Sequence, residues 1–159
     1  MCKLTQNKYE NKRGIELVRY HFEDKYTKKI KNLADKISML IPELQYIDKG
    51  DFDVVIAVEP APRSRSTGDT TIAEMNYVTH WLKHWVEHIK GSEIPKFIMI
   101  VYPVFFGLPK KRQVKVLIHE LFHISPKKRG CRPHTGFGDE TIHKFYSSQL
   151  RKLSKHKLV

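Results

Sequence analysis

Residues 114–124 read VKVLIHELFHI, and this stretch decides how the chain folds. Pro109 can occupy the first turn of a helix, and the Ser125-Pro126 step ends one, because the residue before a proline avoids helical geometry. Beyond Lys115 the stretch is apolar almost all round a helical circumference, which is typical of a buried helix. The sequence therefore predicts an interior helix between Pro109 and Ser125.

Three ionisable side chains interrupt this apolar helix: His119, Glu120 and His123. Positions i and i+4 share one helix face, so both imidazoles can reach one metal ion. Glu120 is rotated by about 100° from His119, which places it beside the metal, where a general base belongs. This is the H-E-x-x-H pattern of zinc peptidases. The alternative, two hydrogen-bonded core histidines and an ion-paired glutamate, needs three partners where one ion suffices.

A catalytic zinc needs a third protein ligand and an open fourth position. His134 is the first candidate, because it lies in a turn-rich loop that can bring its imidazole back over the preceding helix. His143 is the second and Glu140 the third, both on the last predicted helix. Cys131 is a competent ligand, but it is equally well explained as a small buried residue.

A second group of histidines competes for metal. His80, His84 and His88 recur every four residues and would stack on one helix face, which binds divalent metals in isolation. The nearby carboxylate, Glu87, points elsewhere on a helix. An exposed polar face is the favoured interpretation, and a second metal site stays open.

Length and composition limit the setting. We expect one domain over residues 1–159, with N-terminal helices in 1–50 and a catalytic core in 51–159. The two cysteines, Cys2 and Cys131, imply no disulfide framework, which suits a reducing compartment. The polar N-terminus lacks a signal-peptide core, and the longest apolar run, 97–102, is too short to span a membrane. These features predict a cytoplasmic protein with no membrane partner.

The chain is strongly basic, with a net charge of +12 and a pI near 9.7. The clusters Lys110–Arg112 and Lys127–Arg129 flank the two ends of the predicted helix. They favour contact with a phosphate backbone, and hence non-specific nucleic-acid binding, or an acidic substrate. A lysine-rich solvated surface explains them as well, and no nucleic-acid-binding motif is present.

Hydrophobic periodicity predicts an α+β chain. Apolar residues at helical spacing predict helices over 10–23 and 26–41, and β-branched runs predict strands over 53–59 and 96–102. Residues 60–70 form a loop, residues 72–90 a helix whose start at 71–78 could be a strand, and 139–153 the last helix. The strand at 96–102 is the predicted edge with which an extended peptide would pair.

The motif and the element order from Asp53 to Phe145 resemble the small zincin-type metallopeptidases of phages, archaeal viruses and prokaryotic genomes. The resemblance is carried by HELFHI at 119–124 and by Arg-Pro-His at 132–134. It implies a single-domain minimal zincin-like fold, in which a small mixed or antiparallel sheet packs against helices around a central motif helix. A more distant similarity to SprT-like proteases, which act on DNA-bound proteins, would give the basic surface a purpose.

The resemblance implies one Zn²⁺ per chain on His119, His123 and His134, with Glu120 as the general base. The expected reaction is hydrolysis of peptide bonds in a peptide or protein substrate by a metal-activated water.

A donor for the oxyanion is also needed. His143 is the first choice, and Arg132, Tyr102 and Tyr146 stay open. Two rival functions also stay open: a non-proteolytic zinc amide hydrolase, and a basic nucleic-acid-binding protein with a structural zinc site.

Overall fold

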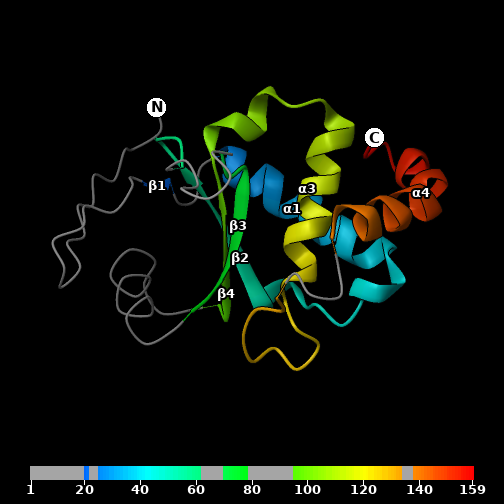
Figure 1. Ribbon diagram of the computed structural model, residues 1–159, viewed down its shortest axis with the longest axis horizontal. Helices are drawn as coiled ribbons and strands as arrows, with labels where there is room; N and C mark the ends of the chain where they lie inside the picture. The colour runs from blue at the N-terminus through cyan, green and yellow to red at the C-terminus, as the bar shows by residue number, and fades with distance from the viewer. Residues whose placement is uncertain (1–19, 22–24, 62–69, 79–94, 134–137) are drawn as a thin grey trace, which may run out of the picture.

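The computed structural model describes residues 20–21, 25–61, 70–78, 95–133 and 138–159. Over these ranges a mixed sheet packs with one face against helices (Figure 1), which confirms the predicted α+β class. The strands are β1 (Tyr20–His21), β2 (Phe52–Ala57), β3 (Ala73–Tyr77) and β4 (Phe97–Val101). The helices are α1 (Lys25–Leu40), α3 (Lys110–Phe122) and α4 (Asp139–Lys155), with short 3₁₀ turns η1 (Pro42–Leu44), η2 (Lys49–Asp51) and η3 (Pro103–Gly107).

The strand order in the described sheet is β1-β2-β4-β3. β2 and β4 run parallel, with Phe52 opposite Phe97, whereas β1 and β3 pair antiparallel on the outside. Every residue of β4 is buried, as expected for an internal strand of the sheet. The prediction that this strand is the free edge was therefore wrong: β3 lies outside it, beside α3.

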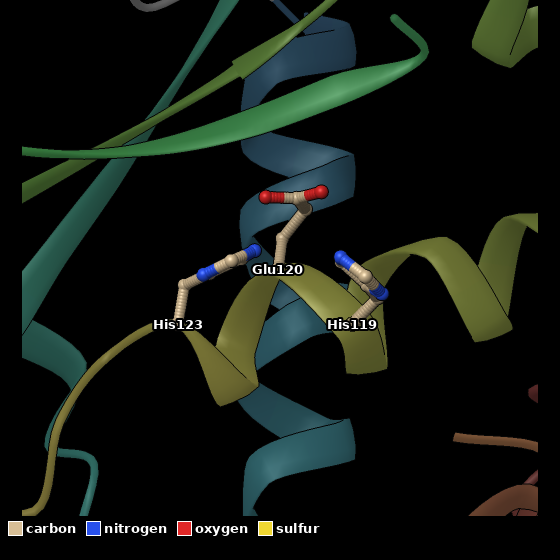
Figure 2. Close-up of side chains that lie close together, drawn as sticks. All are labelled: His119, Glu120 and His123. Atoms are coloured by element: carbon tan, nitrogen blue, oxygen red, sulfur yellow. The ribbon is translucent and has the colours of Figure 1, made fainter. Parts of the chain in front are cut away.

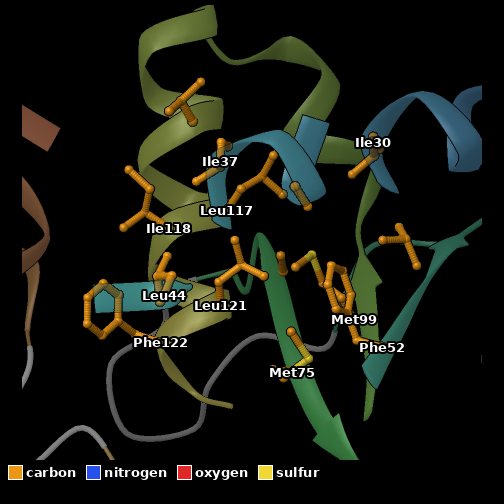
Figure 3. Packing of buried hydrophobic residues seen from close by; sticks show 14 of the residues in the cluster. Ile30, Ile37, Leu44, Phe52, Met75, Met99, Leu117, Ile118, Leu121 and Phe122 are labelled. Atoms are coloured by element: carbon orange, nitrogen blue, oxygen red, sulfur yellow. The ribbon is translucent and has the colours of Figure 1, made fainter. Parts of the chain in front are cut away.

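The core lies between the sheet and α1 and α3 (Figure 3). On α3, Val114, Leu117, Ile118 and Leu121 recur at helical spacing, and each is fully buried. They pack with the sheet residues and with the apolar stripe of α1, so the opposite face of α3 is left for other contacts. Burial of these residues therefore fixes how α3 is rotated about its own axis.

Several predicted elements are confirmed. The helices over 26–41 and 139–153 correspond to α1 and α4, and the strands over 53–59 and 96–102 correspond to β2 and β4. The helix predicted between Pro109 and Ser125 is α3, with Pro109 as its N-cap.

Two helix predictions were wrong where the structure describes them. Residues 73–77 form β3, as the alternative strand start at 71–78 allowed, because they pair with β4 along their whole length. Tyr20 and His21, inside the helix predicted over 10–23, instead pair with Ala57 and Ile56 of β2. The rest of both predicted helices, and residues 62–69 of the predicted loop, lie outside the described residues. Within the described part of the chain, no helix has the length and apolar character needed to cross a membrane.

Candidate active site

The face of α3 that points away from the core borders a cleft of about 940 Å³. Arg112, Val116, His119 and His123 follow one another at spacings of three or four residues, so they share this face. The remaining walls are β3 with the residues before it (70–76), the segment 131–133, and the start of α4. The motif therefore lies where a helix, an edge strand and a returning loop meet.

His119, Glu120 and His123 form the candidate metal-binding group of the described residues. Each places one ligand atom within 4.8 Å of the others, and the two imidazole centroids are 5.1 Å apart. Figure 2 shows the two rings on either side of the Glu120 carboxylate. The helical turn between i and i+4 brings these rings together, as the sequence predicted.

Glu120 is almost completely buried, with 6% of its surface exposed. Loss of solvation raises the pKa of its carboxyl to about 8, an effect opposed by a backbone hydrogen bond from Met75 and reinforced by the nearby charge of Glu74. A carboxyl between the two imidazoles is placed to exchange a proton with a water in the cleft, which is what a general base or acid must do.

His123 is oriented by the backbone of Arg132. Its Nδ1 lies 2.7 Å from the Arg132 carbonyl oxygen, and the Arg132 N–H donates to the His123 carbonyl at 2.6 Å. Because a carbonyl oxygen can only accept, Nδ1 carries the proton and Nε2 keeps the lone pair that binds a metal. This fixed tautomer is a common feature of metal-binding histidines.

The donor set fits a zinc ion. Imidazole nitrogens are good zinc ligands, and a catalytic site uses three protein ligands beside an open position. His119 and His123 are half-buried at the wall of the cleft, so a metal held by them would be reached from it. The first-ranked third ligand, His134, lies outside the described residues, as do His80, His84 and His88.

The other candidate ligands lie apart from the His-Glu-His group. His143 borders the cleft from α4, where its Nδ1 lies 3.0 Å from Lys115 Nζ and its Nε2 lies 3.5 Å from Ser147 Oγ. Glu140 is exposed in the first turn of α4. Cys131 borders the cleft, and its thiol donates to the Met75 carbonyl at 3.4 Å. Cys131 is exposed, so its interpretation as a small buried residue was wrong; partial loss of solvation at the sulfur raises the pKa of the thiol.

The four candidate oxyanion donors divide into two pairs. Arg132 and His143 line the cleft. Tyr102 and Tyr146 are buried, 5% and 2% exposed, and are not among the described residues that line it. The placement favours the first pair as groups that could reach a substrate.

Met75 is a site residue that the sequence reasoning missed. Its backbone bonds to the Glu120 carboxylate, and its carbonyl accepts the Cys131 thiol. The alternation of apolar and polar residues at Ala73, Glu74 and Met75 favours a strand, but the sequence does not show which groups the backbone of that strand contacts. Its position beside the motif comes from the strand order.

The model of the family described as putative phage metallopeptidase matches residues 20–155. The chain belongs to this family. The matched range contains α3 with its motif and every described strand, which confirms the family resemblance of the sequence. Membership indicates a metal-dependent peptidase, that is, a hydrolase acting on peptides or proteins. No curated protein and no solved structure matches the chain.

Proposed function

We propose that this metallopeptidase family member is a zinc-dependent peptidase, in which His119 and His123 hold the metal and Glu120 is the general base. The observation that carries the proposal is the group of three ligand atoms within 4.8 Å of one another, at the wall of an open cleft. We further propose His134 as the third ligand and one zinc ion per chain, on the strength of the Arg-Pro-His segment alone.

A bound zinc ion supplies Lewis-acid polarisation of the scissile carbonyl and a lowered pKa for the attacking water. Glu120 takes the proton of that water and later delivers it to the leaving amine. The Met75 hydrogen bond holds the carboxylate in place on the side of β3.

The edge strand β3 supports an extended peptide as the substrate. Ile72 O and Val78 N bond to the chain that carries β4, at 3.0 and 2.8 Å. Since backbone groups alternate in direction along an antiparallel strand, those of Ala73 point away from β4. The Met75 groups point the same way, but Glu120 and Cys131 already occupy them. The Ala73 groups therefore face the cleft side, where a substrate backbone can pair with the start of β3.

Lys115 and His143 support a role in stabilising the oxyanion. They contact each other where α3 meets α4, and together they present an ammonium and an imidazole to the cleft. We propose that this pair, rather than His143 alone, stabilises the negative charge that develops on the carbonyl oxygen.

The rival functions make different demands on the same site. A structural zinc site has four protein ligands and no open position, which the cleft beside Glu120 disfavours. A non-proteolytic amide hydrolase needs a compact pocket, whereas this cleft extends along α3 from His123 to Arg112. Both observations favour the peptidase.

The test is a comparison of Glu120→Gln with wild type. We expect the variant to keep about one zinc and the same fold, while hydrolysis of a fluorogenic peptide mixture falls by several orders of magnitude. Glu43→Gln, an exposed residue of η1, is the matched control and should be fully active. Loss of zinc from Glu120→Gln would instead make Glu120 a ligand, and unchanged hydrolysis would remove it from the mechanism.

A further inference from the structure

The chain turns back on itself immediately after the motif helix. Ser125 accepts a backbone hydrogen bond from Lys128 at 2.8 Å, and both Lys128 (φ 54°) and Gly130 (φ 122°) adopt left-handed backbone conformations. A bridge between Ile124 and Cys131 then brings the returning chain alongside the end of α3. The carbonyl of Arg132, which holds His123 Nδ1, is thus set by the geometry of this loop.

A single hydroxyl contacts both ends of the loop. Tyr46 Oη donates to the carbonyl oxygen of Ile124, the residue after His123. Tyr46 Oη in turn accepts a hydrogen bond from Arg132 Nη2 at 3.2 Å. The Arg132 guanidinium also lies over the Phe122 ring, 5.7 Å from its centroid. Tyr46 therefore links the end of α3 to the residue whose carbonyl orients the imidazole.

Tyr46 is itself firmly held. Its neighbours Leu44 and Ile47 are buried in the core, so the segment between η1 and η2 cannot move without exposing them. The same segment contacts the loop a second time, because Lys128 Nζ bonds to Asp48 at 2.8 Å and Asp51 at 2.6 Å. Residues 46–51 and the loop after α3 are therefore fastened together at two points.

We propose that Tyr46 is a positioning residue of the metal centre: it holds the loop after α3 so that the Arg132 carbonyl keeps His123 Nε2 directed at the metal. The proposal rests on the proposed function, since it takes His123 as a ligand. Tyr46 lies in the N-terminal third of the chain, 77 positions before His123, so this part of the chain would take part in forming the metal site. Removing the hydroxyl releases both the Ile124 carbonyl and the Arg132 side chain, while the ring can stay in place.

Tyr46→Phe tests this role through metal binding. Loss of an outer partner of a metal-binding histidine typically weakens metal affinity about 10–100-fold, and we expect a loss of this size in a chelator competition with Zn²⁺. The visible spectrum of bound Co²⁺ should also change in Tyr46→Phe, because this spectrum reports the geometry of the metal ligands. If Tyr46 only stabilised the fold, the spectrum would stay the same. Tyr26→Phe removes a hydroxyl from an exposed ring on α1 and is the matched control.

A second variant keeps the test decisive if Tyr46→Phe folds poorly. Arg132→Met removes the guanidinium but keeps the carbonyl and the Tyr46–Ile124 contact. It should weaken zinc binding relative to wild type, by less than the roughly 10–100-fold expected for loss of a full outer partner; zinc affinity equal to that of wild type would contradict the role of the Tyr46–Arg132 contact. Imidazole ¹⁵N spectra of the protein without added metal should show His123 protonated at Nδ1 in wild type and a tautomer mixture in Tyr46→Phe.

The outcomes separate the two proposals. Wild-type zinc affinity, Co²⁺ spectrum and His123 tautomer in Tyr46→Phe, with zinc still lost from His123→Ala, would overturn the positioning role and leave the metal centre standing. Equal zinc content in wild type, His119→Ala and His123→Ala would overturn the metal centre and the role of Tyr46 with it.

Discussion

Lys115 Nζ lies 3.0 Å from His143 Nδ1, and this contact joins α3 to α4 across one wall of the cleft. Because an ammonium can only donate, the imidazole accepts through Nδ1 and carries its proton on Nε2, on the side of Ser147 Oγ. Lys115 also lies over the Tyr146 ring, 5.0 Å from its centroid, which restrains the ammonium. The Lys115 ammonium and the His143 imidazole are therefore held side by side at the cleft.

We predict that Lys115 and His143 are coupled in catalysis. Lys115→Met and His143→Ala should each lower kcat/KM by roughly 100- to 1000-fold, the range measured for removal of a single oxyanion donor. The double variant should lose little more than the worse single variant, because either change breaks the same contact. A peptide-hydrolysis assay on the four proteins measures this, and strictly multiplicative losses would show that the two residues act independently.

The identity of the third ligand is tested by substituting each of the three candidates in turn. His134→Ala should weaken zinc binding by more than the roughly 10–100-fold that an outer partner costs, since a ligand is lost. His143→Ala and Glu140→Gln should bind zinc as wild type does. Elemental analysis and chelator competition measure stoichiometry and affinity. A loss confined to His143→Ala would transfer the assignment to α4, and metal that survives His119→Ala would point to His80, His84 and His88.

The ion pair of Lys128 with Asp48 and Asp51 should stabilise the loop after α3. Lys128→Asn is the cleanest test, because asparagine tolerates the left-handed backbone at this position (φ 54°). We expect its Tm to fall at pH 7 by no more than roughly 2–4 °C, because solvent screens an ion pair at the surface. The exposed neighbour supplies the control variant, Lys127→Asn, whose Tm should be unchanged.

This stabilisation has a defined pH dependence. The Lys128 hydrogen bond holds the pKa of Asp48 below its ordinary value of 3.8, so the contribution is present above that pH and is lost as the pH falls through the lower, folded-state pKa. Both carboxylates raise the pKa of Lys128 above 10.5, so the contribution is also lost as the pH rises through that higher value. The Tm difference between wild type and Lys128→Asn should persist from pH 5 to pH 9 and shrink towards pH 3; a constant difference would contradict the ion pair as its cause.

Nucleic-acid binding is expected to be weak. Lys128 is paired with two carboxylates, Lys110 Nζ donates to the Lys157 carbonyl at 2.8 Å, and Lys111 lies over the Tyr146 ring. We predict sequence-independent binding of labelled DNA that falls steeply between about 50 and 200 mM salt, because it depends on counterion release. Charge reversal at Lys127 and Arg129 should weaken it, whereas Lys128→Asn should not. Binding that withstands high salt would contradict this prediction, and no binding at low salt would leave the lysines as solvated surface.

The local part of the site could be predicted from the sequence, because it depends on helical periodicity alone. The spacing of His119 and His123 brings their rings to 5.1 Å, and the apolar residues of α3 decide which face is buried. The buried run of β4 and the stripe of α1 were predictable for the same reason. In each case, neighbours three or four positions apart on a helix, or successive residues of a strand, carry the whole signal.

What the sequence by itself determined, then, is the motif helix, its buried face and the chemistry of its three ionisable side chains. The tertiary structure decided which strand borders that chemistry: β3 rather than β4 lies at the edge, and its Met75 backbone reaches Glu120. It also decided that Tyr46 reaches Ile124 across 78 positions. Strand order and such distant contacts depend on how whole elements pack to bury their apolar faces, and side-chain periodicity within one element carries no information about its partner.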